Sequence, residues 1–308
     1  MKLKSVLLTL LVFVSAKLHA EEYPRIEDSV NPSLQHKLER SLEKLGLERA
    51  IKSNKLSVAL VDITDTHAPR TALINGDHMM YAASLPKIAI LFGVFSRIES
   101  DELQLTDSLR ERLTKMIRFS SNSAATEMLN LAGKQYLAEL LQAAPYRLYD
   151  TSHNGGLWVG KEYGRGAAFK RDPLHNLSHG ATALQVARFY YLLETNRLVK
   201  PTLQQEMKEI LSKPGINHKF VKGLNANRPG AEIFRKSGSW KHWHADSALV
   251  ERNGRKYIAV GLAESAKGGQ WLSDMIVAMD DLIMDTPTTV AANTSADSVQ
   301  LASMSLKH

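Results

Sequence analysis

In YAASLPKIAILFGVF, residues 81–95, a serine and a lysine stand three positions apart at the start of an apolar run. From Ser84 to Glu99 the apolar residues recur at helical spacing, which predicts a buried helix. Pro86 suits the first turn of that helix, where its missing N–H leaves no hydrogen bond unmade. Residues three apart share a helix face, so we expect Lys87 to reach the Ser84 hydroxyl.

The setting of this pair, more than its spacing, favours catalysis. A helix N-terminus favours negative charge, and a lysine buried against Ile88 and Leu91 would have a lowered pKa and act as a neutral base. The same spacing in SLEK, residues 41–44, lies on a charged helical surface and needs no chemical explanation. Taken alone, Ser84 and Lys87 can equally be two polar residues at a helix start.

Residues 1–20 predict a secretory signal peptide. Two lysines precede an apolar run from Val6 to Val14, and Ala20 is a small residue at a plausible cleavage point. The run is too short to span a bilayer, so a membrane anchor is the less favoured alternative. We therefore expect a secreted, periplasmic protein with no stable membrane anchor.

The composition narrows the class of protein. About 288 residues remain after cleavage, enough for one large domain or two packed subdomains. The chain has no cysteine, which excludes a disulfide framework and a thiolate metal site. The formal charge of +7 includes three lysines of the signal segment, and no basic run is interleaved with aromatic residues, so nucleic acid is not an expected partner.

Strand-forming segments flank a middle region that is mostly helical. An amphipathic helical pattern runs from Pro32 to about Lys52. Strands are then expected at 56–63 and near 71–74. From residue 231 strands return, one of them turning at Asn253-Gly254, and a closing helix follows at about 270–284. Helical patterns fill the middle, with an interruption between Asp150 and Gly180.

This order predicts an α/β plus all-α fold. One antiparallel sheet with flanking helices would be built from both ends of the domain, and a helical subdomain would be inserted between them. The expected boundaries are a domain over 21–285, its α/β part at 21–80 and 231–285, and its helical part at 81–230. Residues 286–308 are small and polar without periodicity, which predicts a disordered tail.

Two further motifs follow the serine and lysine in order. Ser120-Ser121-Asn122 comes after a helical stretch, and Lys236-Ser237-Gly238 lies on a candidate strand. Serine-x-asparagine is common in this chain, whereas lysine-serine-glycine occurs once. With residues 84–87 they resemble the three motifs of the penicillin-recognising serine acyltransferases, which include class A β-lactamases and penicillin-binding proteins. The resemblance covers roughly residues 56–284, and the local sequences around the second and third motifs are most similar to those of class A β-lactamases.

The resemblance implies a β-lactamase/transpeptidase-like fold and a catalytic group of three residues. Ser84 would attack a strained lactam or peptide carbonyl and Lys87 would accept or relay its proton. Ser120 would pass a proton to the leaving nitrogen. Asn122 would hold the amide side chain of the substrate.

The resemblance assigns substrate binding to the third motif. Lys236 and Ser237 would bind the substrate carboxylate, and Gly238 would let the strand approach closely. The backbone N–H groups of Ser84 and Ser239 would hold the oxyanion. Each residue also has a plain structural alternative: Ser120 as a helix cap, Asn122 as a turn residue and Lys236 as a solvated strand lysine.

The chain departs from class A in the segment between Asp150 and Gly180. The glutamate-x-x-leucine-asparagine signature that supplies the deacylation base is absent. Glu162 and Asp172 are the acids available there. Glu162 is a candidate water activator, and the alternative is a surface residue in a glycine-rich loop. The short spacing between Ser84 and Ser120 also indicates a trimmed helical part.

A different chemistry must be weighed just after the glycine. His242, His244 and Asp246 alternate, a spacing that zinc hydrolases also use. No second ligand group frames them, so we expect no metal and no other cofactor. The favoured interpretation is that Trp240, Trp243 and the two histidines line the rim of the cleft.

The expected function is a serine hydrolase that acts through an acyl-enzyme on a β-lactam or a related amide. The alternatives are a D-alanyl-D-alanine peptidase, another amide or ester hydrolase, or a penicillin-binding sensor that turns over slowly. The expected partner is a small-molecule or peptidoglycan-derived amide, and a monomer is expected.

Overall fold

The computed structural model of this protein describes residues 23–285. The predicted signal peptide and the predicted disordered tail lie outside these residues. Within them, none of the helices combines the length and the hydrophobicity needed to cross a bilayer. The elements, in chain order, are η1 (Ile26–Asp28), α1 (Pro32–Lys44), α2 (Glu48–Lys52), β1 (Leu56–Asp62), β2 (Arg70–Ile74), β3 (Met80–Tyr81), α3 (Lys87–Glu99), α4 (Asp107–Arg118), α5 (Asn122–Ala132), α6 (Lys134–Gln142), β4 (Tyr149–Asp150), η2 (Thr151–His153), β5 (Gly155–Gly156), β6 (Trp158–Val159), β7 (His179–Ala181), α7 (Ala183–Glu194), α8 (Pro201–Leu211), α9 (Phe220–Asn227), β8 (Glu232–Trp240), β9 (Trp243–Arg252), β10 (Arg255–Glu264) and α10 (Gly268–Met284).

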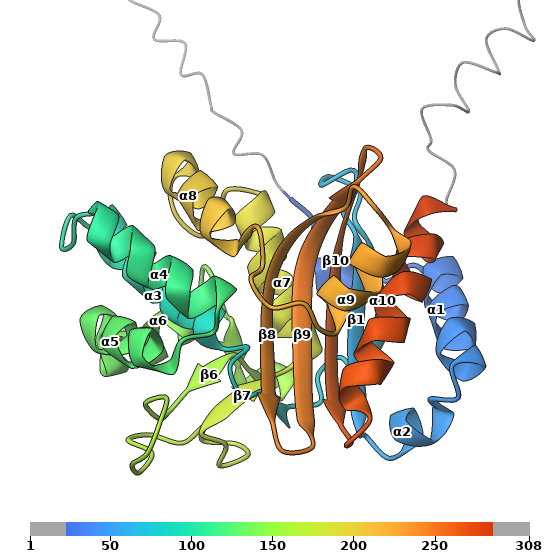
Figure 1. Ribbon diagram of the computed structural model, residues 1–308, viewed down its shortest axis with the longest axis horizontal. Coiled ribbons are helices and arrows are strands. Elements are labelled where there is room, and N and C mark those ends of the chain that lie inside the picture. Colours follow the sequence, from blue (N-terminus) through green and yellow to red (C-terminus); the bar gives the residue numbers. More distant parts are fainter. Residues whose placement is uncertain (1–22, 286–308) are drawn as a thin grey trace, which may run out of the picture.

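The main sheet joins the two ends of the described chain. Its strand order is β2-β1-β10-β9-β8, and each neighbouring pair is antiparallel (Figure 1). The β9–β10 hairpin turns at Asn253 and Gly254, where φ is 49° and 72°, as a two-residue turn with two left-handed positions requires. These features confirm the predicted fold class.

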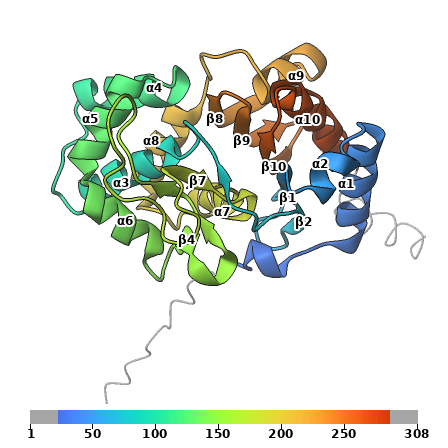
Figure 2. The same cartoon turned by 90° about the horizontal axis from the view of Figure 1, so that it is seen from below.

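Both faces of the sheet are buried, which explains why its strands are apolar throughout. Along β1, Val58 and Leu60 pack with α1, α9 and α10, whereas Ala59 and Val61 face the larger core that includes α3 and α7. Figure 2 shows α3 to α6 and α8 gathered on the side of the sheet opposite to α1, α9 and α10. The edge strand β8 lies next to that helical group.

Three local expectations change. The helical pattern to Lys52 is broken by Gly46, whose φ of 70° ends one helix before α2 begins. The interruption between 150 and 180 contains short strands: β6 and β7 form a small sheet with β3, and β5 pairs with β4. Helix α9 packs on α10 against the main sheet, so the expected boundary at residue 230 falls after a helix that covers the sheet.

A buried ion pair fixes the position of α9 relative to the edge of the sheet. Arg235 on β8 donates two hydrogen bonds to Asp246 on β9, at 2.6 and 2.7 Å. The Asp246 carboxylate also accepts from the N–H of Phe220, the first residue of α9 (3.1 Å). Both charged side chains are almost fully buried, so each depends on the other for compensation.

Replacing Asp246 with asparagine leaves the buried Arg235 guanidinium without its counter-charge. We expect the free energy of unfolding to fall by about 3–5 kcal/mol, measured by urea denaturation. The matched control is Glu127→Gln, which removes the half-exposed ion pair with Arg112 and is expected to cost at most about 1 kcal/mol. Equal losses in the two variants would contradict this account of the pair.

Candidate active site

The proposed nucleophile lies in a tight turn between β3 and α3. The N–H of Leu85 donates to Ala82 O (3.0 Å) and that of Lys87 to Ser84 O (3.3 Å), so Ser84 precedes the α-helix, which begins at Lys87 and not at residue 84 as expected. Ala83 has a left-handed φ of 52°. Strained backbone of this kind often marks functional sites. Among residues 23–285, no partner hydrogen-bonds the Ser84 hydroxyl.

Lys87 is completely buried, yet its ammonium group contacts only neutral acceptors. Nζ donates to Ser120 O (2.6 Å), to Asn122 Oδ1 (2.9 Å), and more weakly to Ser120 Oγ and Ser121 O (both 3.3 Å). Burial lowers the pKa of Lys87 from its ordinary 10.5 to about 7. A lysine in this state can act as a base at neutral pH.

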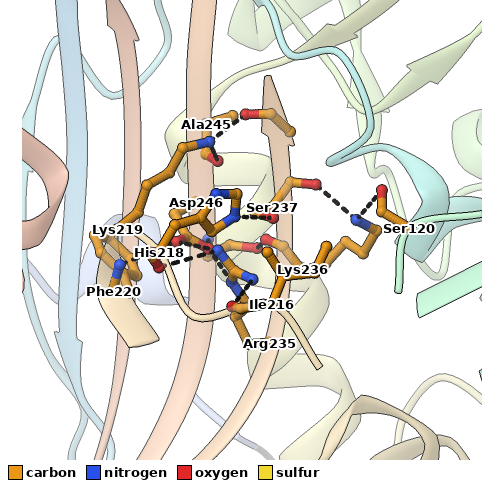
Figure 3. Close-up of polar contacts among 12 residues, drawn as sticks. Ser120, Ile216, His218, Lys219, Phe220, Arg235, Lys236, Ser237, Ala245 and Asp246 are labelled. Atoms are coloured by element: carbon orange, nitrogen blue, oxygen red, sulfur yellow. Dashed lines mark hydrogen bonds and ion pairs between the residues drawn. The ribbon is translucent and has the colours of Figure 1, made fainter. Parts of the chain in front are cut away.

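Ser120 is presented by the turn between α4 and α5, and two amines converge on it. Its φ of 58° is left-handed, and the Ser121 side chain caps α5 by accepting from Ala124 N (3.2 Å). Lys236, on β8, donates to Ser120 Oγ at 3.0 Å (Figure 3). Burial, and then the proximity of Lys87, lower the pKa of Lys236 well below its ordinary value. The Ser120 hydroxyl thus lies between two lysines.

The edge strand β8 runs directly against the turn that holds Ser84. A Cβ at Gly238 would lie 2.1 Å from Ala82 O and 2.7 Å from Ser84 N, so only glycine permits this approach. The next residue, Ser239, therefore follows immediately after the contact with the nucleophile turn. This proximity is compatible with an oxyanion held by the N–H groups of Ser84 and Ser239.

Two residues that the sequence analysis did not identify, His218 and Lys219, form hydrogen bonds with β8 from the segment just before α9. His218 Nε2 lies 3.1 Å from Ser237 Oγ (Figure 3). Lys219 Nζ donates to Gly238 O and to Ser239 Oγ (2.7 Å). Burial lowers the pKa of His218 to about 4 and that of Lys219 to about 8. No sequence motif marks these residues, since their partners are about twenty positions away.

An aromatic ring, also missed from the sequence, lies beside Lys87. The centre of the Tyr163 ring is 4.5 Å from Lys87 Nζ, and the Tyr163 hydroxyl donates to Ala83 O (3.3 Å). Thr126 anchors the backbone of Tyr163 through both its N–H and its carbonyl group. The His179 ring packs against the Tyr163 ring, with 4.3 Å between the two ring centres. A ring face attracts a cation, but the burial that it provides favours a neutral lysine.

The two acids proposed from the loop do not approach this centre. Glu162 forms an ion pair with Lys134, and the hydrogen bond from Lys134 lowers its pKa. Asp172 is buried and holds its own loop, accepting from Tyr149 Oη (2.9 Å) and Leu177 N (2.7 Å). Among residues 23–285, no carboxylate contacts Lys87 or Ser120. The geometry gives no support to Glu162 as a water activator.

The alternating histidines and aspartate do not gather into a set of metal ligands among the described residues. Asp246 is fully buried in its pair with Arg235, whereas His242 is exposed and lies 3.6 Å from Glu264. No cluster of three metal-ligating side chains occurs in the part of the chain that the structure describes. Trp240 and Trp243 instead line a cavity of about 460 Å³ with Tyr81, three residues before Ser84.

A family model described as the beta-lactamase enzyme family matches residues 37–112 and 106–286. The chain belongs to the beta-lactamase enzyme family. No curated protein matches its sequence.

Several solved structures share this fold. PBP-A superposes with a TM-score of 0.64 at 15% identity, covering 86% of this chain and 100% of that one. The beta-lactamase from Sphaerobacter thermophilus gives 0.64 at 15% identity, covering 82% and 99%. A PBP-A mutant, solved as an acyl-enzyme complex with penicillin G, gives 0.64 at 16% identity, covering 83% and 98%. Family and fold together support a beta-lactamase-like hydrolase.

The approach of β8 to the nucleophile turn can be tested with Gly238→Ala. The added methyl group meets backbone atoms on Ala82 and Ser84, so β8 must move away. We expect a loss of about 1–3 kcal/mol of stability, read as a fall in Tm. The control is Gly269→Ala, where the added carbon meets His244 at an ordinary 3.7 Å. If Gly238→Ala melts no lower than this control, the close contact is refuted.

Proposed function

We propose that the protein is a serine hydrolase that opens a β-lactam or a related amide through an acyl-enzyme on Ser84. One observation carries the proposal: Lys87 Nζ and Lys236 Nζ lie 3.3 and 3.0 Å from the same hydroxyl, Ser120 Oγ. Ser120 thus links both amines in a path by which a proton can reach a leaving group, and Lys87, three residues after Ser84, is the base that amide cleavage requires.

In the first step, neutral Lys87 takes the proton of Ser84 while the serine oxygen bonds to the substrate carbonyl carbon. The carbonyl oxygen becomes an oxyanion, which the N–H groups of Ser84 and Ser239 stabilise. Hydrogen bonds of this kind often tighten only when substrate binds, so the unbonded Ser84 hydroxyl is compatible with the step.

In the second step, the carbon–nitrogen bond breaks and the leaving nitrogen needs a proton. Lys87 returns the proton that it took, and the Ser120 hydroxyl relays it to that nitrogen. Lys236 donates to Ser120 and, with Ser237, offers a binding site for the substrate carboxylate. A substrate carboxylate beside Lys236 would favour the protonated form of this buried amine, which favours an anionic substrate.

Labelling with a fluorescent penicillin tests this mechanism. Ser84→Ala is expected to abolish labelling, and Lys87→Ala to slow it by at least about 100-fold because the base is lost. Wild-type labelling should accelerate as the pH rises through about 7, where Lys87 loses its proton, and level off above that. A rate that still climbs toward pH 10 would refute a neutral Lys87.

The chain supplies a matched control. Ser41→Ala and Lys44→Ala alter the same serine-lysine spacing on α1, away from Ser120 and Lys236, and both should label at the wild-type rate. Labelling that survives Ser84→Ala would exclude this serine as the nucleophile.

A second candidate function is a penicillin-binding protein that releases its acyl group slowly. Tyr163 is the observation that favours it, because an aromatic ring and not a carboxylate lies beside Lys87. Without a carboxylate to activate water, hydrolysis of the ester on Ser84 would depend on Lys87 as its only nearby base. The acyl group could then pass to another acceptor, as in a peptidase or transferase, or remain bound, as in a sensor.

The lifetime of the adduct separates the two functions. A penicillin adduct on Ser84 that persists for hours by mass spectrometry, with a burst of nitrocefin cleavage followed by little turnover, would favour the slow penicillin-binding protein. Sustained nitrocefin hydrolysis with no adduct would instead favour an efficient lactamase. It would also require a water-activating base other than Glu162.

The proposal includes export and the partner. A substrate derived from peptidoglycan or an antibiotic is met outside the cytoplasm, in keeping with the signal peptide predicted at residues 1–20. We further propose that the protein acts as a monomer on this small-molecule or peptidoglycan-derived amide.

A further inference from the structure

Lys219, just before α9, is a buried ammonium group to which the proposed mechanism gives no role. The residue is only 3% exposed. Its Nζ donates to Gly238 O, to Ser239 Oγ (2.7 Å) and to Ala245 O (3.0 Å), and Figure 3 shows Lys219 reaching Ala245. An ammonium group has three N–H donors, so these acceptors leave none for a substrate. Any role of Lys219 in the reaction must therefore be indirect.

The fold keeps this charge in an unfavourable place. None of the three acceptors is a carboxylate, and the nearby Asp246 carboxylate is bonded to Arg235 and to the N–H of Phe220. Burial lowers the pKa of Lys219 to about 8, which still leaves the amine charged at neutral pH. Its backbone has a positive φ of 51°, with ψ of −121°. A buried charge and a strained backbone in one residue favour a functional role.

The peptide bond between Gly238 and Ser239 joins Lys219 to the proposed oxyanion site. The β8–β9 hairpin has a two-residue turn after Trp240, and its register pairs Gly238 with Ala245. Because hydrogen-bonded and non-hydrogen-bonded pairs alternate from such a turn, the Gly238 carbonyl group points toward β9. The N–H of Ser239 belongs to the same planar peptide and points the opposite way, toward the open edge of β8. Lys219 therefore contacts the carbonyl end of the peptide whose N–H end faces the substrate.

We propose that Lys219 is a positioning residue that polarises the Gly238–Ser239 peptide and thereby strengthens its N–H as an oxyanion donor. The ammonium group draws electron density toward Gly238 O, which leaves the N–H of Ser239 more positive. The donor is then fixed and polarised before the reaction starts, as stabilisation of a developing oxyanion requires. This inference rests on the proposed function, since it assigns a role within acylation of Ser84.

Pre-steady-state acylation by benzylpenicillin at pH 7 tests this, because it separates the dissociation constant of the initial complex from the rate of acylation. Loss of a whole oxyanion donor costs about 100- to 1000-fold in rate, so we expect the loss of polarisation in Lys219→Met to slow acylation about tenfold. The dissociation constant should stay within about twofold of the wild type, because the effect is confined to the transition state. A purely structural Lys219 would loosen β8, which also carries Ser237, and would weaken initial binding as well.

Lys222→Met is the matched control. It removes the same charge from an exposed side chain on α9, one turn after Lys219, and should acylate at the wild-type rate. Lys219→Gln keeps a neutral donor in place of the ammonium group, so it serves as the test if Lys219→Met does not fold. We expect Lys219→Gln to slow acylation at least about threefold, with the dissociation constant unchanged.

Phenylboronic acid gives a second readout of the oxyanion site. It forms a tetrahedral adduct on a reactive serine with an oxygen in the oxyanion position, so Lys219→Met should weaken its binding about tenfold. Wild-type acylation and boronate binding in the Lys219 variants, or a penicillin dissociation constant that rises as much as acylation slows, would overturn the proposal. These outcomes leave acylation of Ser84 intact, whereas a wild-type protein that benzylpenicillin does not acylate would refute the proposed function and this inference with it.

Discussion

The burial of two lysines around one serine hydroxyl is the constraint on which the site depends. Lys87 and Lys236 are 0% and 1% exposed, and both contact Ser120 Oγ. An ammonium group taken out of water needs strong compensation, and here Lys87 receives only carbonyl, amide and hydroxyl oxygens. A carboxylate would hold the proton on the lysine. Neutral acceptors compensate the charge less, so the Lys87 ammonium group can lose its proton near neutral pH.

This arrangement requires three separate parts of the fold to meet. Helix α3 brings Lys87 from the interior, the α4–α5 turn brings Ser120, and β8 brings Lys236 from the edge of the sheet. Left-handed backbone at Ala83 and Ser120 is held in place by the packing around it. Lys219 and the Arg235–Asp246 pair hold β8 in place through hydrogen bonds to the start of α9 and to β9. Catalytic geometry is thus placed on rigid elements, as precise positioning demands.

The sequence predicted most of the architecture, because its signals are local. Apolar runs predicted the strands, helical spacing predicted α3, and Asn253-Gly254 predicted the hairpin turn. Motif order suggested that residues 84, 120 and 236 would meet, and the resemblance to the family is confirmed. The features that the sequence did not predict depend on contacts between residues far apart in the chain. Tyr163 reaches Lys87 through its anchor on Thr126, and α9 joins the sheet through Asp246. Neither contact leaves a local pattern.

The protonation state of Lys87 is the most direct measure of this account. In a pH titration followed by carbon-13 NMR of the lysine Cε atoms, with Lys87→Arg used to assign the signal, the account predicts a midpoint near pH 7. A midpoint near 10.5, the ordinary value for lysine, would mean that Lys87 stays charged at neutral pH and cannot be the base.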